Sequence, residues 1–169
     1  MTVENYCRVY SELYGLDTVS LRYFNVYGTR QKGTGAYANV ISSWCTKLAK
    51  DEPIIVYGDG TQIRYYVHVS SVVKANIAAA FDYTSLSGSV FNVGTGSCWS
   101  VNDLVGLFRA SNGHSLNVKF EPGRVGDVLQ TCASTTKLER FFPALKDQKN
   151  GLGTFLNPTL KWYKENTKL

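Results

Sequence analysis

A chain of 169 residues is long enough for one ordinary domain, and its 44% hydrophobic and 18% charged content excludes a disordered protein. No apolar run approaches the ~20 residues of a membrane helix, and residues 1–5 lack the features of a signal peptide, so a cytoplasmic protein with no membrane partner is expected. The net charge of +5 indicates an anionic partner, but Lys and Arg are spread along the chain, which disfavours nucleic acid.

The four cysteines are far apart in sequence and form no C-x-x-C pair. They are Cys7, Cys45, Cys98 and Cys132. We therefore expect reduced core thiols and no redox pair. With only two histidines beside them, no metal site is expected either.

The first part of the sequence predicts alternating helices and strands. Apolar residues recur at helical spacing over residues 1–14, and Gly15 ends this helix. A strand over residues 17–23 follows, an order typical of a parallel sheet. Residues 37–48 predict a second helix, and residues 53–57 predict a short strand that ends in a glycine turn.

A second run of elements begins with alternating residues at 64–69, which predict a strand. Ser70 or Ser71 is the expected cap of a helix that extends to Tyr83. Residues 89–93 predict a buried strand that ends at a Gly-Thr-Gly turn.

The last third of the chain predicts smaller elements. Ser100 and Asp103 form a capping box for a helix that extends to about Ser111. Three further elements are an edge strand at residues 117–120, a short helix capped by Ser134, and a last helix over about residues 154–165. The order indicates a mixed α/β fold, in which a small α+β lobe is attached to part of a parallel sheet.

Asn25 lies where the first predicted strand ends, between aromatic residues and the turn at Gly28. Ligands of open α/β sheets lie outside the carboxyl ends of the strands, so Asn25 is a candidate ligand contact. An asparagine that ends a strand by bonding to its own turn fits the same position.

Four segments, in this order, resemble the C-terminal half of an extended short-chain dehydrogenase/reductase of the NAD-dependent nucleotide-sugar epimerase/dehydratase family. They are residues 21–28 (LRYFNVYG), 35–41 (GAYANVI), 57–69 (YGDGTQIRYYVHV) and 121–128 (EPGRVGDV). Residues 91–96 and 160–163 also fit. The second segment is most similar to 4-epimerases of UDP-glucose or UDP-N-acetylglucosamine.

The resemblance implies an α/β fold: the C-terminal part of a Rossmann-like parallel sheet with a small α+β substrate-binding lobe. Residues 1–169 would then form one truncated unit. Residues 1–34 and about 60–95 would lie on the Rossmann side, and about 35–59 and 96–169 in the lobe that binds the nucleotide-sugar.

The resemblance also implies roles for single residues near the first strand. Tyr23 and Phe24 match positions beside the nicotinamide cofactor, NAD. Asn25 matches an asparagine that binds the nucleotide-sugar near its diphosphate. Asn39, followed by Val40, matches a second substrate contact at the start of a helix.

Four later residues complete the implied site. Tyr57 matches the position that packs against the base, Arg64 and Arg124 match two arginines that hold the diphosphate, and Asp127 matches an acid that takes a sugar hydroxyl. A planar guanidinium suits phosphate oxygens, whereas a carboxylate is repelled by them. Each of these residues also fits a purely structural role. Taken alone, Arg64 is typical of a surface ion pair and Asp127 is typical of a turn. Tyr57 and Phe24 are typical of core aromatic residues.

Two parts of the family's redox machinery are missing from the sequence. No glycine-rich turn opens a helix after a first strand, and no Tyr-x-x-x-Lys pair is present, so we assign no catalytic residue. In relatives this lysine would immediately precede Met1, which explains why the first helix lacks a cap. A further departure is Tyr65, because relatives have an acid after the arginine of the third segment.

The leading hypothesis is therefore the substrate-binding part of an NAD-dependent nucleotide-sugar 4-epimerase that is inactive alone. A non-catalytic nucleotide-sugar-binding module, paired with a separate Rossmann chain or with a second copy, is the alternative from another class. A second alternative is that the chain is a fragment of a dTDP- or UDP-sugar dehydratase or decarboxylase.

Overall fold

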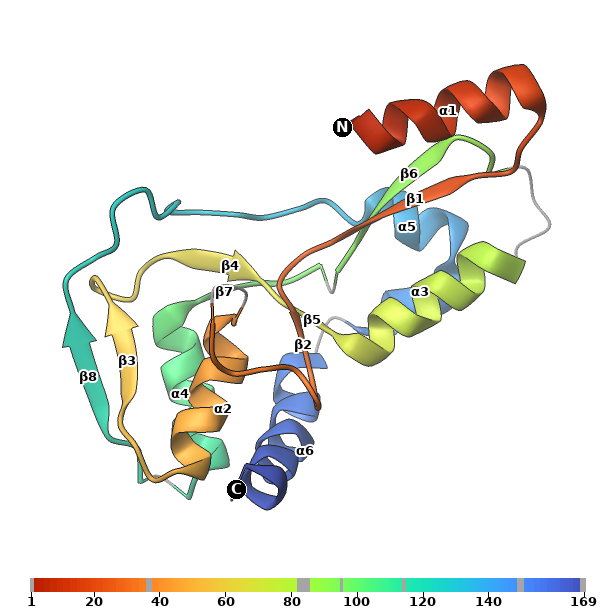
Figure 1. The fold of residues 1–169 in the computed structure, drawn as a ribbon. Helices are drawn as coiled ribbons and strands as arrows, with labels where there is room; N and C mark the ends of the chain where they lie inside the picture. The colour runs from red at the N-terminus through yellow and green to blue at the C-terminus, as the bar shows by residue number, and fades with distance from the viewer. Residues whose placement is uncertain are drawn as a thin grey trace.

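A computed structural model describes residues 2–35, 38–81, 86–94, 96–113, 115–148 and 151–167. One part of the fold is a pair of parallel strands, β1 (Val19–Tyr23) and β6 (Ser89–Val93), paired from Val19–Ser89 to Tyr23–Val93. Helix α1 (Thr2–Tyr14) lies on one side of this pair, and α3 (Val69–Phe81) with α5 (Thr136–Phe141) lies on the other (Figure 1). Helices on both faces of parallel strands confirm the Rossmann-like class.

The second part is a lobe of three helices covered by short strands. Its helices are α2 (Val40–Ala49), α4 (Val101–Ser111) and α6 (Gly151–Asn166), and its strands are β3 (Ile54–Tyr57), β4 (Ile63–Tyr65), β7 (Cys98–Ser100) and β8 (Val118–Glu121). Strands β3 and β8 are parallel, whereas β4 and β7 are antiparallel. The core of the lobe is centred on Trp44, Phe108 and Leu156, which are almost fully buried.

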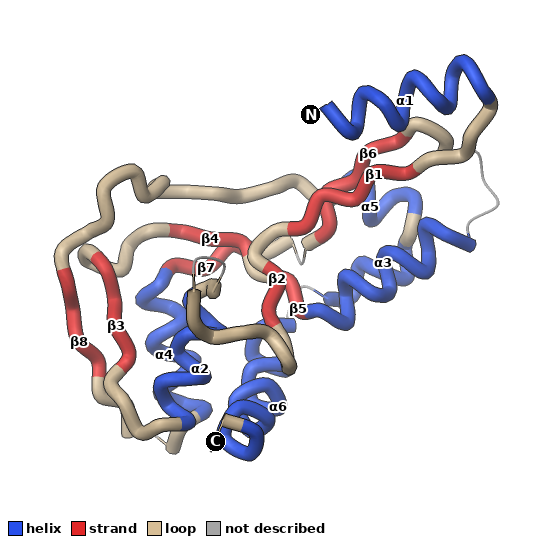
Figure 2. Tube along the Cα trace, viewed as in Figure 1, coloured by secondary structure: helices blue, strands red, loops and turns tan. Residues whose placement is uncertain are grey.

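The two parts meet at a short parallel pair, β2 (Val26–Tyr27) and β5 (Val67–His68), visible at the centre of Figure 2. Tyr27 belongs to the core of the lobe, and Val67 belongs to the second core around β6, α5 and the 3₁₀ helix η1 (Pro143–Gln148). The chain therefore crosses between the two parts at the end of β1, where Asn25 lies.

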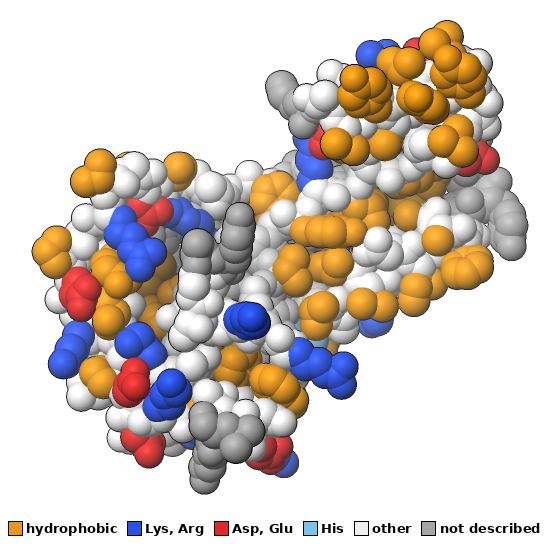
Figure 3. All heavy atoms as spheres, viewed as in Figure 1, with side chains coloured by type: hydrophobic (Ala, Val, Ile, Leu, Met, Phe, Trp, Pro, Cys, Tyr) orange, Lys and Arg blue, Asp and Glu red, His pale blue; other side chains and the backbone are white. Residues whose placement is uncertain are grey.

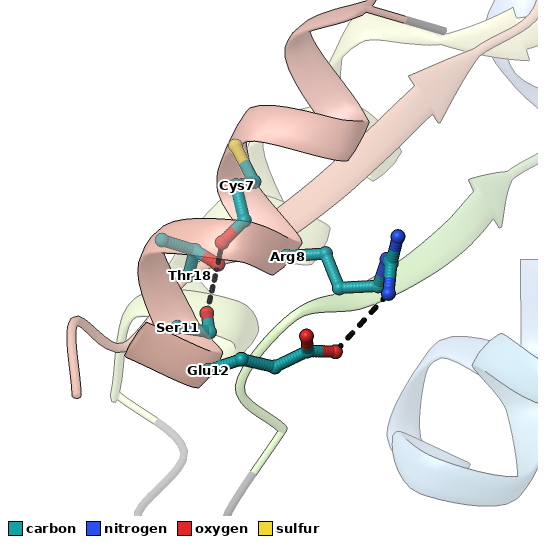
Figure 4. A network of polar contacts seen from close by, with 5 residues as sticks. All are labelled: Cys7, Arg8, Ser11, Glu12 and Thr18. Carbon is teal, nitrogen blue, oxygen red and sulfur yellow. Dashed lines mark hydrogen bonds and ion pairs between the residues drawn. The ribbon is translucent and has the colours of Figure 1, made fainter. Parts of the chain in front are cut away.

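Polar contacts attach α1 to the start of β1 (Figure 4). The Thr18 hydroxyl donates to the carbonyl of Cys7 at 3.0 Å and lies 2.6 Å from the Ser11 hydroxyl. Arg8 and Glu12 form an ion pair at 3.2 Å along the exposed side of the helix. No residue of α1 is buried, so these contacts hold a helix that has little hydrophobic anchorage.

Helix starts were predicted with mixed success. Ser100 and Asp103 form the expected capping box. Ser70 and Ser71 are not caps, because α3 already begins at Val69 and the Ser70 amide donates to His68 Nδ1 at 3.3 Å. Ser134 is also not the cap of α5, since Thr135 occupies that position. The predicted end of the third helix at Tyr83, and the start of the second at Tyr37, lie outside the described residues.

The cysteine prediction was wrong for one pair. Cys98 and Cys132 are joined by a disulfide, with their Cα atoms 6.2 Å apart. Cys45 is the buried thiol that was expected, and burial raises its pKa to about 12, which keeps it protonated.

The described residues contain no group of side chains that could hold a metal ion. None of their helices is long and apolar enough to span a bilayer.

His68 makes the stability of the fold depend on pH. Its ring stacks on Phe155 of α6 at 4.2 Å, and burial lowers its pKa. Below the ordinary histidine pKa of about 6.5, the unfolded chain binds a proton that the folded chain resists, so stability falls as pH falls. Urea unfolding at pH 7.5 and 5.5 should show this loss, and His68→Phe should reduce it. Equal pH dependence in both proteins would contradict this role.

Candidate functional site

A cavity of about 300 Å³ opens where the two parts of the fold meet. Its wall includes all seven residues predicted to contact substrate, which are Asn25, Asn39, Val40, Tyr57, Arg64, Arg124 and Asp127. We call it the arginine cavity, after its two arginines. The lining comes from the start of β2 and of α2, from β3 and β4, and from the loop after β8 that carries Arg124 and Asp127.

The two residues predicted to face the cofactor lie outside the arginine cavity. Tyr23 is exposed, and its hydroxyl donates to Asn76 of α3 at 3.0 Å. The ring of Phe24 packs against Tyr65, with centroids 5.7 Å apart. The chain therefore turns between Phe24 and Asn25. Asn25 lines the arginine cavity, whereas Phe24 does not.

Asn25 bridges two segments and does not bond to its own turn. Its side-chain amide donates to the carbonyl of Tyr65 at 2.7 Å, and its own carbonyl accepts from the Val67 amide at 3.4 Å. Its φ of 21° is unusual for a residue other than glycine. Asparagine tolerates such a φ, and its amide satisfies the end of β4.

Asn39 begins α2 as its N-cap. Its Oδ1 accepts from the Ser42 amide at 2.9 Å, and its Nδ2 donates to the Val26 carbonyl at 2.6 Å. Both ends of the side chain thus have structural partners. What this position offers a ligand is the first turn of a ten-residue helix, whose free amides and dipole favour an anion.

Arg64 and Asp127 form an ion pair across the cavity wall. The Arg64 side chain is only 17% exposed, and its guanidinium also donates to the Ile63 carbonyl at 2.9 Å. Asp127, which we predicted to face a sugar hydroxyl, therefore pairs with this arginine and offsets its charge.

Tyr65, which was expected to depart from the family pattern, has a packing role. It is 1% exposed, and its hydroxyl accepts from the Gly96 amide. A Cβ on Gly94 would lie 2.0 Å from the Tyr65 ring, so glycine is needed there. Burial raises the pKa of Tyr65, which excludes a tyrosinate at neutral pH.

Arg124 lies on the other wall, where its guanidinium covers the Tyr57 ring at 3.8 Å from the centroid. Stacking fixes the plane of the guanidinium and leaves its N–H groups free at the edges. Within the part of the chain that the structure describes, no carboxylate pairs with Arg124. The cavity therefore has one neutralised and one available arginine.

Two polar residues of the wall, Gln62 and Tyr66, were not predicted. Gln62 donates to the Tyr57 carbonyl at 2.8 Å, and burial raises the pKa of Tyr66, which keeps its hydroxyl protonated. Both lie inside the third segment that carries the resemblance, and their period-two spacing with Arg64 indicated a shared face of the strand. This spacing is the feature of the sequence from which the two residues could have been predicted.

The fold is an α/β fold of the Rossmann-like class, with a cavity where its two parts meet. The profile of the NAD dependent epimerase/dehydratase family matches residues 1–94, and the chain belongs to that family. The chain spans about half the length of the curated relatives it matches.

Solved structures show the same fold. A UDP-N-acetylglucosamine 4-epimerase from Methanobrevibacter ruminantium, in complex with UDP-N-acetylmuramic acid, is 32% identical with a TM-score of 0.88, covering 97% of this chain and 51% of its own. A UDP-glucose 4-epimerase from Thermotoga maritima with UDP-glucose is 30% identical with a TM-score of 0.84, covering 99% and 52%. Among curated relatives compared by sequence alone, a UDP-N-acetyl-alpha-D-glucosaminuronate decarboxylase from Bacillus cytotoxicus is 30% identical, and the match covers 96% of this chain and 50% of the relative.

Removing the charge of Asp127 should strengthen the binding of UDP. Asp127→Asn leaves Arg64 without its counter-charge, so affinity should rise about 2- to 5-fold, the range of ~0.5–1 kcal/mol for a partly exposed ion pair. Calorimetric titration with UDP measures this change. Glu121→Gln, which removes an exposed acid on β8 outside the cavity, is the matched control and should leave affinity unchanged. Weaker binding by Asp127→Asn would contradict this expectation, and would mean either that the acid contacts the nucleotide or that its pair with Arg64 holds the loop that carries Arg124 in place.

Proposed function

We propose that this chain is the nucleotide-sugar-binding portion of an NAD-dependent nucleotide-sugar 4-epimerase and that it is inactive alone. The observation that carries this proposal is the convergence of Arg64, Arg124 and the N-terminus of α2 on one cavity. Two cationic side chains and a helix N-terminus suit a diphosphate. The ring of Tyr57, under Arg124, offers a surface for the nucleoside side of the ligand.

The described residues do not provide a cradle for the pyrophosphate of NAD. The segment after β6 leads into strand β7 and not into a helix. Gly33 precedes α2, but a Cβ there would lie 1.8 Å from Thr46 Oγ1, so this glycine serves packing against the helix. Because the residues present do not fit the cofactor, we derive no redox step for this chain.

Mapping of amide shifts by NMR, with UDP-glucose as the ligand, tests the proposal. Amides of Val40, Gln62 and Arg124 should shift, whereas those of α3 should not. The same sample, supplied with NAD, should not convert UDP-glucose to UDP-galactose. Shifts confined to other surfaces would refute the assigned site, and measurable epimerisation would refute the inactivity.

Exposed apolar side chains favour a second candidate, a nucleotide-sugar-binding module that pairs with another Rossmann chain. On α1, Val3, Tyr6, Leu13 and Tyr14 are each more than 60% exposed. On α3, exposed residues recur every four positions at Val69, Val73, Ile77 and Phe81. Figure 3 shows apolar atoms over both helices and the strands between them.

Apolar faces of this kind mark surfaces that associate, so the isolated chain is expected to self-associate or to bind a partner. Light scattering coupled to gel filtration should give a mass above that of the monomer. Polar substitutions at Ile77 and Phe81 should restore the monomer without changing UDP affinity. A stable wild-type monomer would count against the second candidate and leave the nucleotide-sugar site unaffected.

The reaction of the parent enzyme is a separate question, since the relatives include a decarboxylase. We propose epimerisation because two similar solved structures, each about 30% identical, are named as 4-epimerases. Dehydration or decarboxylation would use the same cavity for the nucleotide. The full-length enzyme, assayed with UDP-glucose and with UDP-glucuronate, would distinguish these reactions by product.

A further inference from the structure

Fourteen residues connect β8 to α5 without regular secondary structure, and we call residues 122–135 the strap. Figure 2 shows the strap as a long loop that runs beside β4 toward α5. Residues 122–130 are all exposed, and the backbone bonds of the strap to β4 are Ile63 amide to Leu129 carbonyl at 2.8 Å and Thr131 amide to Ile63 carbonyl at 3.1 Å. Both Arg124 and Asp127 are on the strap, so its position determines one wall of the arginine cavity.

The Cys98–Cys132 disulfide fastens the strap to the lobe. Cys98 is in β7, where it pairs with Tyr65 of β4, and Cys132 follows the part of the strap that bonds to β4. The closed loop spans 34 positions and contains both strap residues of the cavity. Cys98 and Cys132 are exposed residues, so a dithiol from solution can reach the bond.

We propose that Cys98 and Cys132 form a site of thiol–disulfide exchange that controls the affinity of the arginine cavity. The proposal rests on the nucleotide-sugar function proposed above. In the exchange, one thiolate of a dithiol reductant attacks a sulfur of the pair and forms a mixed disulfide. Its second thiol then displaces the remaining cysteine. The reductant loses two electrons and two protons and becomes a disulfide, and Cys98 and Cys132 each gain one proton and one electron.

The affinity changes because the cross-link restricts where Arg124 and Asp127 can be. In the oxidised chain the disulfide already restricts the conformations of residues 98–132. Little further conformational entropy is therefore lost when the ligand binds. After reduction, two backbone bonds to β4, the Arg64–Asp127 pair and the stack on Tyr57 hold the cavity side of the strap. Residues 122–130 are all exposed, and an exposed segment held by few contacts opens easily, so the ligand must then order the strap itself.

Calorimetric titration with UDP, before and after treatment with dithiothreitol, tests the proposal on the full chain. Iodoacetamide labelling under denaturing conditions first establishes the state: two labelled cysteines for the oxidised chain and four for the reduced chain. We expect reduction to weaken UDP binding by about tenfold (~1.4 kcal/mol). The double variant Cys98→Ser, Cys132→Ser should bind UDP as the reduced chain does and should not respond to dithiothreitol. Cys7→Ser is the matched control and should respond like the wild type.

Two readouts separate the exchange from a general loss of structure. Trypsin should cleave after Arg124 faster in the reduced chain, and saturating UDP should slow that cleavage, whereas cleavage at Arg8 in α1 should be the same in both states. Four labelled cysteines in the air-oxidised chain, or equal UDP affinity in both states, would overturn the exchange site and leave the proposed function intact. No UDP binding in either state would overturn the proposed function itself.

Discussion

Arg124→Ala is expected to weaken UDP binding by about 10- to 100-fold. The arginine is stacked on Tyr57 at 3.8 Å, so its guanidinium is already oriented toward the cavity. Hydrogen bonds to a charged group contribute about 1.5–3 kcal/mol each, and the variant loses at least one such bond together with the stack. Titration with UDP by calorimetry measures the loss.

Two further variants make this result specific. Arg124→Lys keeps the charge but not the planar donors or the stack, so it should recover only part of the affinity. Lys119→Ala removes one positive charge from the neighbouring strand β8, where the side chain is exposed, and should change affinity little. Equal losses in Arg124→Ala and Lys119→Ala would mean that the chain attracts UDP by net charge alone.

Trp44→Ala is expected to lower the free energy of unfolding by about 3–5 kcal/mol. Trp44 is 2% exposed, its ring meets Phe108 edge-on at 5.3 Å, and its indole N–H donates to the Ile55 carbonyl at 3.0 Å. The variant thus removes a large buried ring and leaves a carbonyl of β3 without its donor. Urea denaturation, followed by circular dichroism, measures the change.

Trp44→Phe isolates the hydrogen bond. Phenylalanine keeps the six-membered ring, so the variant should lower the free energy of unfolding by about 1–3 kcal/mol. This is the penalty of leaving one acceptor without its donor. Val125→Ala, at a fully exposed position of the strap, should leave stability within about 0.5 kcal/mol of the wild type. If Trp44→Ala were as mild as Val125→Ala, the core around α2 would not be what supports β3 and Tyr57.

Local patterns were sufficient to predict most elements of the fold. The helical spacing of residues 1–14, the strands at β1 and β6, and the Ser100–Asp103 box depend on residues close together in sequence. The start of α3 was missed because a histidine ring nitrogen can accept from an amide as a serine hydroxyl does, and the start of α5 was misplaced by one residue, although the Ser134 hydroxyl does accept from the Thr136 amide at 3.4 Å. His68 begins α3 since β5 places it there.

Contacts between segments that are distant in the sequence could not be predicted from local patterns. The Arg64–Asp127 pair joins residues 63 positions apart, and no local pattern indicates that this acid faces an arginine. The Cys98–Cys132 pairing was also hidden, because four scattered cysteines allow several pairings and a reduced state. By contrast, all seven residues predicted to contact substrate line one cavity, since the family resemblance carries long-range information that single residues do not.

We have proposed that this chain holds the nucleotide-sugar side of an active site without the cofactor side. Separate calorimetric titrations of the isolated chain with UDP-glucose and with NAD test this division. We predict saturable binding of UDP-glucose that is competed by UDP and lost in Arg124→Ala, together with no saturable binding of NAD. Saturable binding of NAD in the absence of any binding of UDP-glucose would contradict the account.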